Sequence, residues 1–142
     1  MFDKILIVCV GNVCRSPTGE RLMRKYIPNK FVDSAGISAL VGSEADTNAI
    51  NVANEHNISL ANHSAKQLTK ELCRNFDLIL VMEKKHIEAV CELVPEVRGK
   101  VMLFGHWTSQ EISDPYHKSF EAFQATYILL DAAARKWASK LS

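Results

Sequence analysis

A cysteine and an arginine six positions apart are the two residues of this sequence best suited to chemistry. Cys9 and Arg15 lie in the stretch KILIVCVGNVCRSP, residues 4–17. A cysteine thiolate is a nucleophile, and the planar fork of an arginine guanidinium fits two oxygens of a phosphate. At this spacing the pair predicts a nucleophile placed beneath a bound phosphate, as in a cysteine-dependent phosphatase.

The sequence on either side of the pair predicts a loop between a strand and a helix. Residues 5–8 are continuously apolar, like a strand buried on both faces of a parallel sheet. Ser16 and Pro17 predict the start of a helix over residues 17–27, with Ser16 as N-cap. Inward N–H groups and the positive end of a helix dipole bind anions and favour a thiolate. The residues expected to form this phosphate cradle are Val10, Gly11, Asn12, Val13, Cys14 and Ser16.

The spacing by itself has a plain structural explanation. A small buried cysteine can end a strand, and an arginine six residues later can be a solvated surface residue. The apolar strand before the loop and the Ser-Pro pair after it favour the functional interpretation, because that context is what supports such a motif.

Composition limits the class of protein. The chain has 142 residues, 47% of them hydrophobic and 23% charged, which predicts one globular domain over residues 1–142. A net charge of +1 gives no reason to expect nucleic acid or an anionic membrane as partner. The first apolar run, residues 5–10, is too short for a signal sequence or a membrane span, so we expect a cytoplasmic protein without direct membrane insertion. Four cysteines without zinc spacing predict free thiols and no metal site: Cys9, Cys14, Cys73 and Cys91.

Apolar runs alternate with amphipathic segments along the whole chain. Strands are expected at residues 5–8, 31–34, 78–82 and 100–104, and helices at 17–27, 47–55, 70–75, 84–93 and 119–141. This order predicts an α/β fold, a single three-layer domain with a four-stranded parallel twisted sheet and helices on both faces. Ligands of such sheets bind beyond the carboxyl ends of the strands. Cys9 lies at such an end, and the loop at residues 105–116 is expected on the same rim.

Several segments together resemble the low-molecular-weight protein tyrosine phosphatases. The resemblance covers nearly the whole chain, and the sequence is most similar to the bacterial branch of the family that is encoded with exopolysaccharide or capsule operons. It implies hydrolysis of protein phosphotyrosine through a phosphocysteine intermediate, without a metal or another cofactor. It also implies a membrane tyrosine autokinase as substrate, and we expect a monomer. The segments are CVGNVCRSPTGE at 9–20, SAG at 34–36, DLILVMEKKH at 77–86, KVMLFGHW at 100–107 and DPY at 114–116.

The resemblance also implies roles for residues outside the phosphate loop. Asp114 of the Asp-Pro-Tyr segment matches the general acid, and the following proline favours an extended backbone that projects its carboxyl. A plain turn aspartate before proline is the structural alternative. Leu40 and Tyr116 match the walls of the substrate slot. Cys14 matches the second thiol of a reversible disulfide with Cys9, although it could simply fill space.

Two other functions are alternatives to the phosphatase. A thioredoxin-coupled arsenate reductase has the same Cys-x5-Arg loop but needs a relay pair of cysteines near the end of the third strand. This sequence has Met82 there and only Cys91 further on. A non-catalytic phosphotyrosine-binding module is expected to lack Cys9, Arg15 or Asp114, and all three are present. The tyrosine phosphatase therefore agrees best with the sequence.

Overall fold

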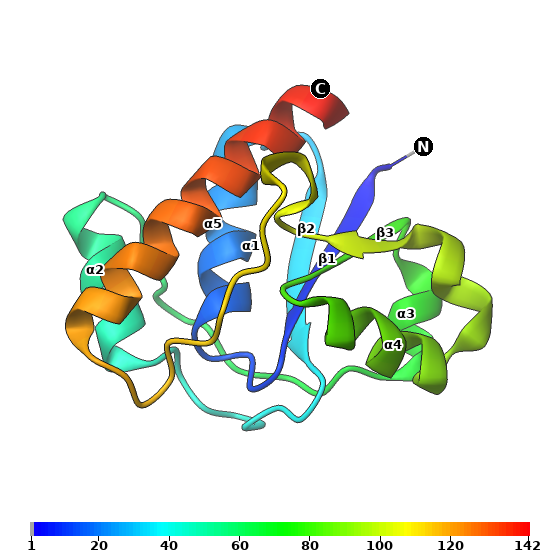
Figure 1. Ribbon diagram of the computed structural model, residues 1–142, viewed down its shortest axis with the longest axis horizontal. Coiled ribbons are helices and arrows are strands. Elements are labelled where there is room, and N and C mark those ends of the chain that lie inside the picture. The colour runs from blue at the N-terminus through cyan, green and yellow to red at the C-terminus, as the bar shows by residue number, and fades with distance from the viewer. Residues whose placement is uncertain (1) are drawn as a thin grey trace.

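The computed structural model describes residues 2–142, which form a four-stranded parallel sheet between two layers of helices (Figure 1). The strand order is β2-β1-β3-β4, and every neighbouring pair is parallel. The predicted fold class is confirmed. In chain order the elements are β1 (Lys4–Cys9), α1 (Arg15–Tyr26), β2 (Phe31–Gly36), α2 (Thr47–Glu55), α3 (Lys70–Asn75), β3 (Leu78–Val81), α4 (Lys84–Leu93), η1 (Pro95–Lys100), β4 (Val101–Leu103), η2 (His106–Thr108) and α5 (Phe120–Leu141).

The two central strands are apolar without interruption because both of their faces are covered. In β1, Ile5 and Ile7 point into one hydrophobic core, whereas Leu6 and Val8 point into the other. All four side chains are completely buried. Alternate side chains of a strand point to opposite faces, so a strand between two helical layers needs apolar residues at every position.

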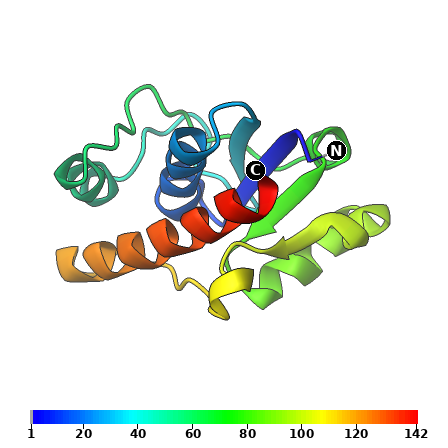
Figure 2. The same ribbon diagram turned by 90° about the horizontal axis from the view of Figure 1, so that it is seen from above.

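Helices of different parts of the chain cover the two faces of the sheet. Figure 2 shows α1, α2 and α5 on one side and α3 and α4 on the other. Trp137 of α5 closes the first core, and its indole N–H donates to the carbonyl of Phe104, just after β4, at 2.8 Å. Within residues 2–142 no helix is both long enough and apolar enough to cross a membrane.

Element ends differ from the sequence prediction where side chains are engaged elsewhere. The prediction of Ser16 as N-cap is wrong: α1 begins at Arg15, and Cys14 precedes it without a capping side-chain bond. Asp46 caps α2 by accepting the Asn48 N–H, and Thr69 caps α3 by accepting from Leu72. Strand β2 is longer than predicted and ends at Gly36, and two short 3₁₀ helices, η1 and η2, occupy segments predicted as turn and loop.

Candidate active site

The loop between β1 and α1 turns its carbonyl groups away from its centre. The carbonyls of residues 9–14 all accept hydrogen bonds from groups outside the loop or from the first turns of α1. An outward carbonyl leaves the N–H groups of a tight loop on the inner side, which is the arrangement of an anion-binding nest. The bonds, in order, come from Ile37, Ser38, Leu40, His63, Asp46 and Thr18.

Two backbone features allow the loop to close this tightly. Asn12 adopts a left-handed backbone with φ of 59°, a conformation that asparagine tolerates better than most residues. Gly36 lies beside Cys9 in the sheet, and a Cβ atom at Gly36 would stand 2.5 Å from the carbonyl oxygen of Val10. The absence of a side chain at Gly36 therefore lets the loop approach the end of β2.

The Cys9 sulfur sits at the base of the loop with an oriented hydroxyl beside it. The Cys9 Sγ to Ser16 Oγ distance is 2.9 Å, and the Asn12 N–H donates to the same sulfur at 3.3 Å. The Asn12 side-chain NH₂ donates to Ser16 Oγ at 2.6 Å, so that oxygen acts as acceptor there. The Ser16 hydroxyl proton is thus free to point at the sulfur, where it stabilises a thiolate.

A buried hydrogen-bond chain continues behind the loop. Asn12 also donates to Ser34 Oγ at 3.1 Å, and the Ser34 hydroxyl donates to Glu20 at 2.7 Å. The Asn12 amide is oriented because its oxygen accepts the N–H of Lys66 at 3.0 Å. Every member therefore has a fixed donor or acceptor role, which holds the loop rigid from the side opposite the pocket.

Arg15 is almost fully buried and is held along one edge. Its Nη1 donates to a carboxylate oxygen of Glu83 and to the carbonyl oxygen of Ile112, each at 2.7 Å. Its Nη2 lies 3.6 Å from Asp114, and its Nε has no hydrogen-bond partner among residues 2–142. Burial alone would raise the pKa of Glu83, but the hydrogen bond and charge of Arg15 hold that pKa below its usual range. The Nε and Nη2 edge remains available for an oxyanion.

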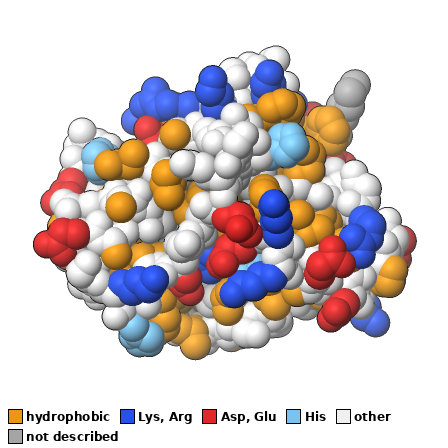
Figure 3. Space-filling view, in the orientation of Figure 1, with side chains coloured by type: hydrophobic (Ala, Val, Ile, Leu, Met, Phe, Trp, Pro, Cys, Tyr) orange, Lys and Arg blue, Asp and Glu red, His pale blue; other side chains and the backbone are white. Residues whose placement is uncertain are grey.

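The slot above the loop is lined by the residues that the sequence predicted. Leu40, Asp114 and Tyr116 border a pocket whose floor is Cys9 and the loop. Asp114 is 42% exposed, and its Oδ1 accepts the N–H of Tyr116 at 3.1 Å. The Tyr116 ring contacts the His117 ring at an interplanar angle of 39°, with ring centroids 3.9 Å apart. In Figure 3, which has the orientation of Figure 1, acidic side chains lie beside basic ones near the centre of the visible face.

The four cysteines are free thiols and lie in two groups. Cys9 and Cys14 belong to the phosphate loop, and Cys73 and Cys91 belong to the core on the opposite face of the sheet. Burial, followed by the nearby Asp46 carboxylate, raises the pKa of Cys14, so this thiol stays protonated near neutral pH. Met82 is completely buried at the end of the third strand. Within residues 2–142, no three His, Cys, Asp or Glu side chains are grouped as metal ligands would be.

The residues that hold this site from behind were not assigned from the sequence. Glu83 binds Arg15, Ser34 and Glu20 anchor Asn12, and the His63 ring bonds the carbonyl of Asn12 at 2.6 Å. Two of these residues could have been found from the sequence by their position. Ser34 and Glu83 are polar residues at the carboxyl ends of β2 and β3, which is the sheet edge where ligands bind.

Comparison with protein families identifies the class to which this fold and site belong. Residues 4–142 match the model of the low molecular weight phosphotyrosine protein phosphatase family. The chain belongs to this family, which confirms the resemblance and the predicted enzyme class, a protein-tyrosine phosphatase.

Individual relatives are similar over their full length. The protein-tyrosine phosphatase Wzb of Escherichia coli K12 is 60% identical over 143 residues, which cover 100% of this chain and 97% of Wzb. The crystal structure of the Erwinia amylovora tyrosine phosphatase AmsI superposes with a TM-score of 0.98 at 58% identity, covering 100% of this chain and 95% of that one. Vibrio vulnificus Wzb in complex with benzylphosphonate has a TM-score of 0.97 at 54% identity, covering 99% of each chain.

Proposed function

We propose that this protein hydrolyses protein phosphotyrosine through a phosphocysteine intermediate on Cys9. One observation carries the proposal: the Cys9 sulfur lies at the base of a loop whose carbonyls all bond outward, with the free edge of Arg15 beside it. A nucleophile and preorganised oxyanion donors in one place fit phosphoryl transfer.

In the first step the Cys9 thiolate attacks phosphorus in line with the tyrosyl oxygen. The sulfur–phosphorus bond forms, the phosphorus–oxygen bond to tyrosine breaks, and its electron pair stays on the tyrosyl oxygen. Asp114 donates a proton to that oxygen, so tyrosine leaves as a neutral phenol. The position of Asp114 in the wall of the pocket, with a partly exposed carboxyl, supports this role.

In the second step water replaces the sulfur. Asp114, now a carboxylate, accepts a proton from the water as the water oxygen attacks phosphorus. The sulfur–phosphorus bond breaks, the electron pair returns to Cys9 as thiolate, and inorganic phosphate leaves. Ser16 stabilises the thiolate at the start and end of the cycle through its hydroxyl, 2.9 Å from the sulfur.

Arg15 and the loop N–H groups stabilise the charge on the equatorial oxygens in both steps. The guanidinium presents Nε and Nη2 as two parallel donors, which fits two phosphate oxygens. Glu83 and the carbonyl of Ile112 hold the opposite edge. The N–H donors contributed by Val10, Gly11, Asn12, Val13, Cys14 and Ser16 complete the cradle.

The slot walls support an aromatic substrate side chain. Leu40, which is 43% exposed, and Tyr116 both line the pocket above the loop. An apolar slot above a phosphate site accommodates the phenyl ring of phosphotyrosine. A related Wzb was crystallised with benzylphosphonate, an aromatic phosphonate.

The cellular assignments are part of the same proposal. We propose that the chain is a single-domain, cytoplasmic monomer that acts on a membrane tyrosine autokinase of exopolysaccharide or capsule export. The high similarity to Wzb and AmsI supports this assignment. We also propose that Cys9 and Cys14 form a reversible disulfide under oxidation, since both thiols belong to one loop.

The test is phosphate release from a phosphotyrosine peptide, measured with and without arsenate and thioredoxin. Release that depends on neither supports the phosphatase, whereas reduction of arsenate coupled to thioredoxin would establish the reductase instead. Cys9→Ser should bind inorganic phosphate and release none from the peptide, because the cradle and Arg15 remain. Binding of the peptide by the parent without any release would establish a binding module.

A further inference from the structure

Two buried side-chain nitrogens have no hydrogen-bond partner among residues 2–142, and both belong to residues that contact Glu83. They are Arg15 Nε and His86 Nε2. The first belongs to the arginine that binds phosphate in the proposed function. The second belongs to the first turn of α4, and nothing in the mechanism above uses it. The Nδ1 atom of the imidazole caps the start of α4 by accepting the Glu83 N–H. A buried N–H without a partner lowers stability, so Nε2 needs an explanation beyond this cap.

The tautomer of His86 follows from its contacts with Glu83. The Glu83 N–H donates to His86 Nδ1 at 3.2 Å, and the His86 N–H donates to the Glu83 carbonyl at 2.9 Å. Because Nδ1 is an acceptor, the ring proton of neutral His86 is on Nε2. That Nε2–H lies 3.6 Å from Oε2 of Glu83, the oxygen that binds Arg15.

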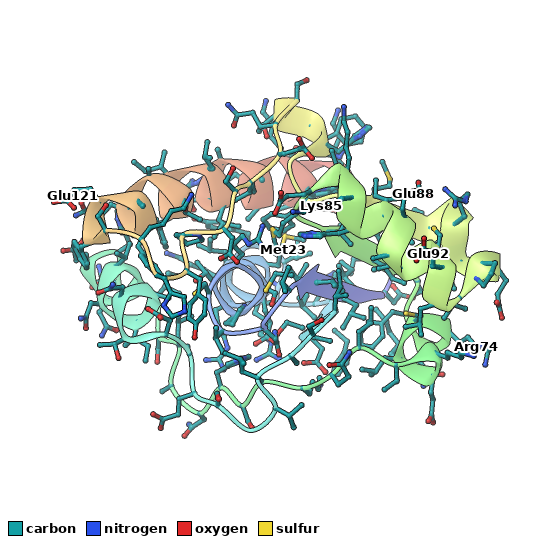
Figure 4. All side chains as sticks on the ribbon, turned by 60° about the horizontal axis from the view of Figure 1, so that its bottom comes forward. Met23, Arg74, Lys85, Glu88, Glu92 and Glu121 are labelled. Carbon is teal, nitrogen blue, oxygen red and sulfur yellow. The ribbon has the colours of Figure 1, made fainter. Side chains whose placement is uncertain are left out.

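These contacts connect the imidazole to the arginine of the phosphate loop. His86 fixes the backbone of Glu83 through Nδ1 and directs its Nε2–H at the carboxylate, and that carboxylate holds Arg15 Nη1 at 2.7 Å. Figure 4, where Lys85 marks the first turn of α4, shows this turn close to the loop after β4, and the Lys84 N–H bonds Glu111 of that loop.

We propose that His86 is a positioning residue for the phosphate site, acting through Glu83 on Arg15. The neutral imidazole holds the Glu83 carboxylate in the direction that keeps the Nε and Nη2 edge of Arg15 facing the cradle. The second acceptor of Nη1, the Ile112 carbonyl, is itself fixed because the Ile112 N–H bonds the carbonyl of Met82 at 2.9 Å. Arg15 is then held by two segments, at Glu83 and at Ile112, and loss of one of these contacts lets the guanidinium rotate.

The charges around His86 keep it neutral. Arg15, Glu83, Lys85 and Asp114 are the charged groups that act on its ring. Burial, with the positive charge of Arg15 next, holds the pKa of His86 below its usual range, so Nδ1 stays an acceptor at neutral pH.

The experiment compares His86→Leu, which has no acceptor, with His86→Asn, whose amide oxygen can accept the Glu83 N–H. We expect kcat for a phosphotyrosine peptide to fall about 10–100-fold in the leucine variant, as for other residues that orient an active-site group, with KM changed less than about twofold. The asparagine variant should recover to within about threefold of the parent. Should leucine prevent folding, His86→Met tests the same loss.

Two controls separate positioning from a general loss of stability. Thr69→Ala removes the cap of α3, which covers the opposite face of the sheet from α1, and should lower the melting temperature without lowering kcat. In a Glu83→Ala background the His86→Leu change should have less than about a twofold further effect, because no side chain at position 83 then connects His86 to Arg15. An unchanged kcat in His86→Leu, or an equal loss in both backgrounds, would overturn the proposal.

This inference rests on the proposed function, and the two fail differently. A parent protein without phosphate release from phosphotyrosine contradicts the function itself. An active parent whose His86 variants retain full kcat contradicts only the positioning role.

Discussion

Replacing Gly36 by alanine tests whether the closeness of β2 and the phosphate loop matters for catalysis. A Cβ at this position would stand 2.5 Å from the Val10 carbonyl oxygen and 3.0 Å from the Asn12 nitrogen, both backbone atoms of the loop. Carbon side-chain atoms essentially never approach oxygen closer than 3.0 Å, so the loop must move by at least about 0.5 Å. Neither contact can be relieved by rotation of a side chain.

The size of the effect follows from this displacement. A misplacement of about 1 Å at a reacting centre reduces the rate roughly 10²-fold, so about 0.5 Å predicts a loss of about tenfold or more in kcat. The overpacking should also lower the free energy of unfolding by about 1–3 kcal/mol. The assay is kcat and KM for p-nitrophenyl phosphate and for a phosphotyrosine peptide, together with a denaturant unfolding curve.

Gly99→Ala is the matched control. A Cβ at Gly99 meets no atom within 4 Å, so this variant should keep the activity and stability of the parent. A Gly36→Ala variant within twofold of the parent in kcat would refute the reasoning, because it would mean that the loop tolerates the displacement without loss of catalytic geometry.

Three further changes have distinct expected results. Asp114→Asn should slow hydrolysis of phosphotyrosine by about 10²–10⁴-fold and that of p-nitrophenyl phosphate distinctly less, because the better leaving group needs less protonation; equal losses would assign Asp114 to loop positioning. Cys14→Ser should be inactivated irreversibly by a peroxide dose from which a thiol reductant restores the parent; full recovery of the variant would deny Cys14 a protective role. His86→Asn should reduce the loss of stability in acid. Burial lowers the pKa of His86 in the folded state, so its contribution to the free energy of unfolding is complete above the unfolded pKa near 6.5 and is lost as the pH falls below that value. Denaturant unfolding curves of parent and variant at pH 7 and pH 5 measure this loss. An identical change in the free energy of unfolding between the two pH values in both proteins would contradict the prediction.

The sequence predicted the parts of the fold that depend on local pattern. The uninterrupted apolar residues of β1 and β3 identified buried parallel strands, and the helices predicted at 47–55 and 70–75 coincide with α2 and α3. The loop between β1 and α1 was located because its residues are contiguous.

The parts that were missed depend on contacts between distant segments. Ser16 was predicted as N-cap of a helix over 17–27 from the Ser-Pro pair, but its hydroxyl is engaged by Asn12 and Cys9, and α1 begins two residues earlier, at Arg15. Glu83 reaches Arg15 across 68 positions of sequence, and its partner His86 looks like an ordinary helical histidine. Local propensity contains no information on which strand ends will meet, so these contacts required the folded structure.

The central claim is that phosphate passes through a covalent bond to Cys9. The measurement is an alkaline quench of the enzyme, in which a phosphorus–sulfur bond survives, during steady-state turnover of a ³²P-labelled phosphotyrosine peptide, followed by mapping of the labelled position in the protein. The account predicts phosphate on Cys9 and on no other residue, with the label disappearing when the peptide is exhausted. Label at a different residue, or turnover at full rate with no label on the protein, would contradict it.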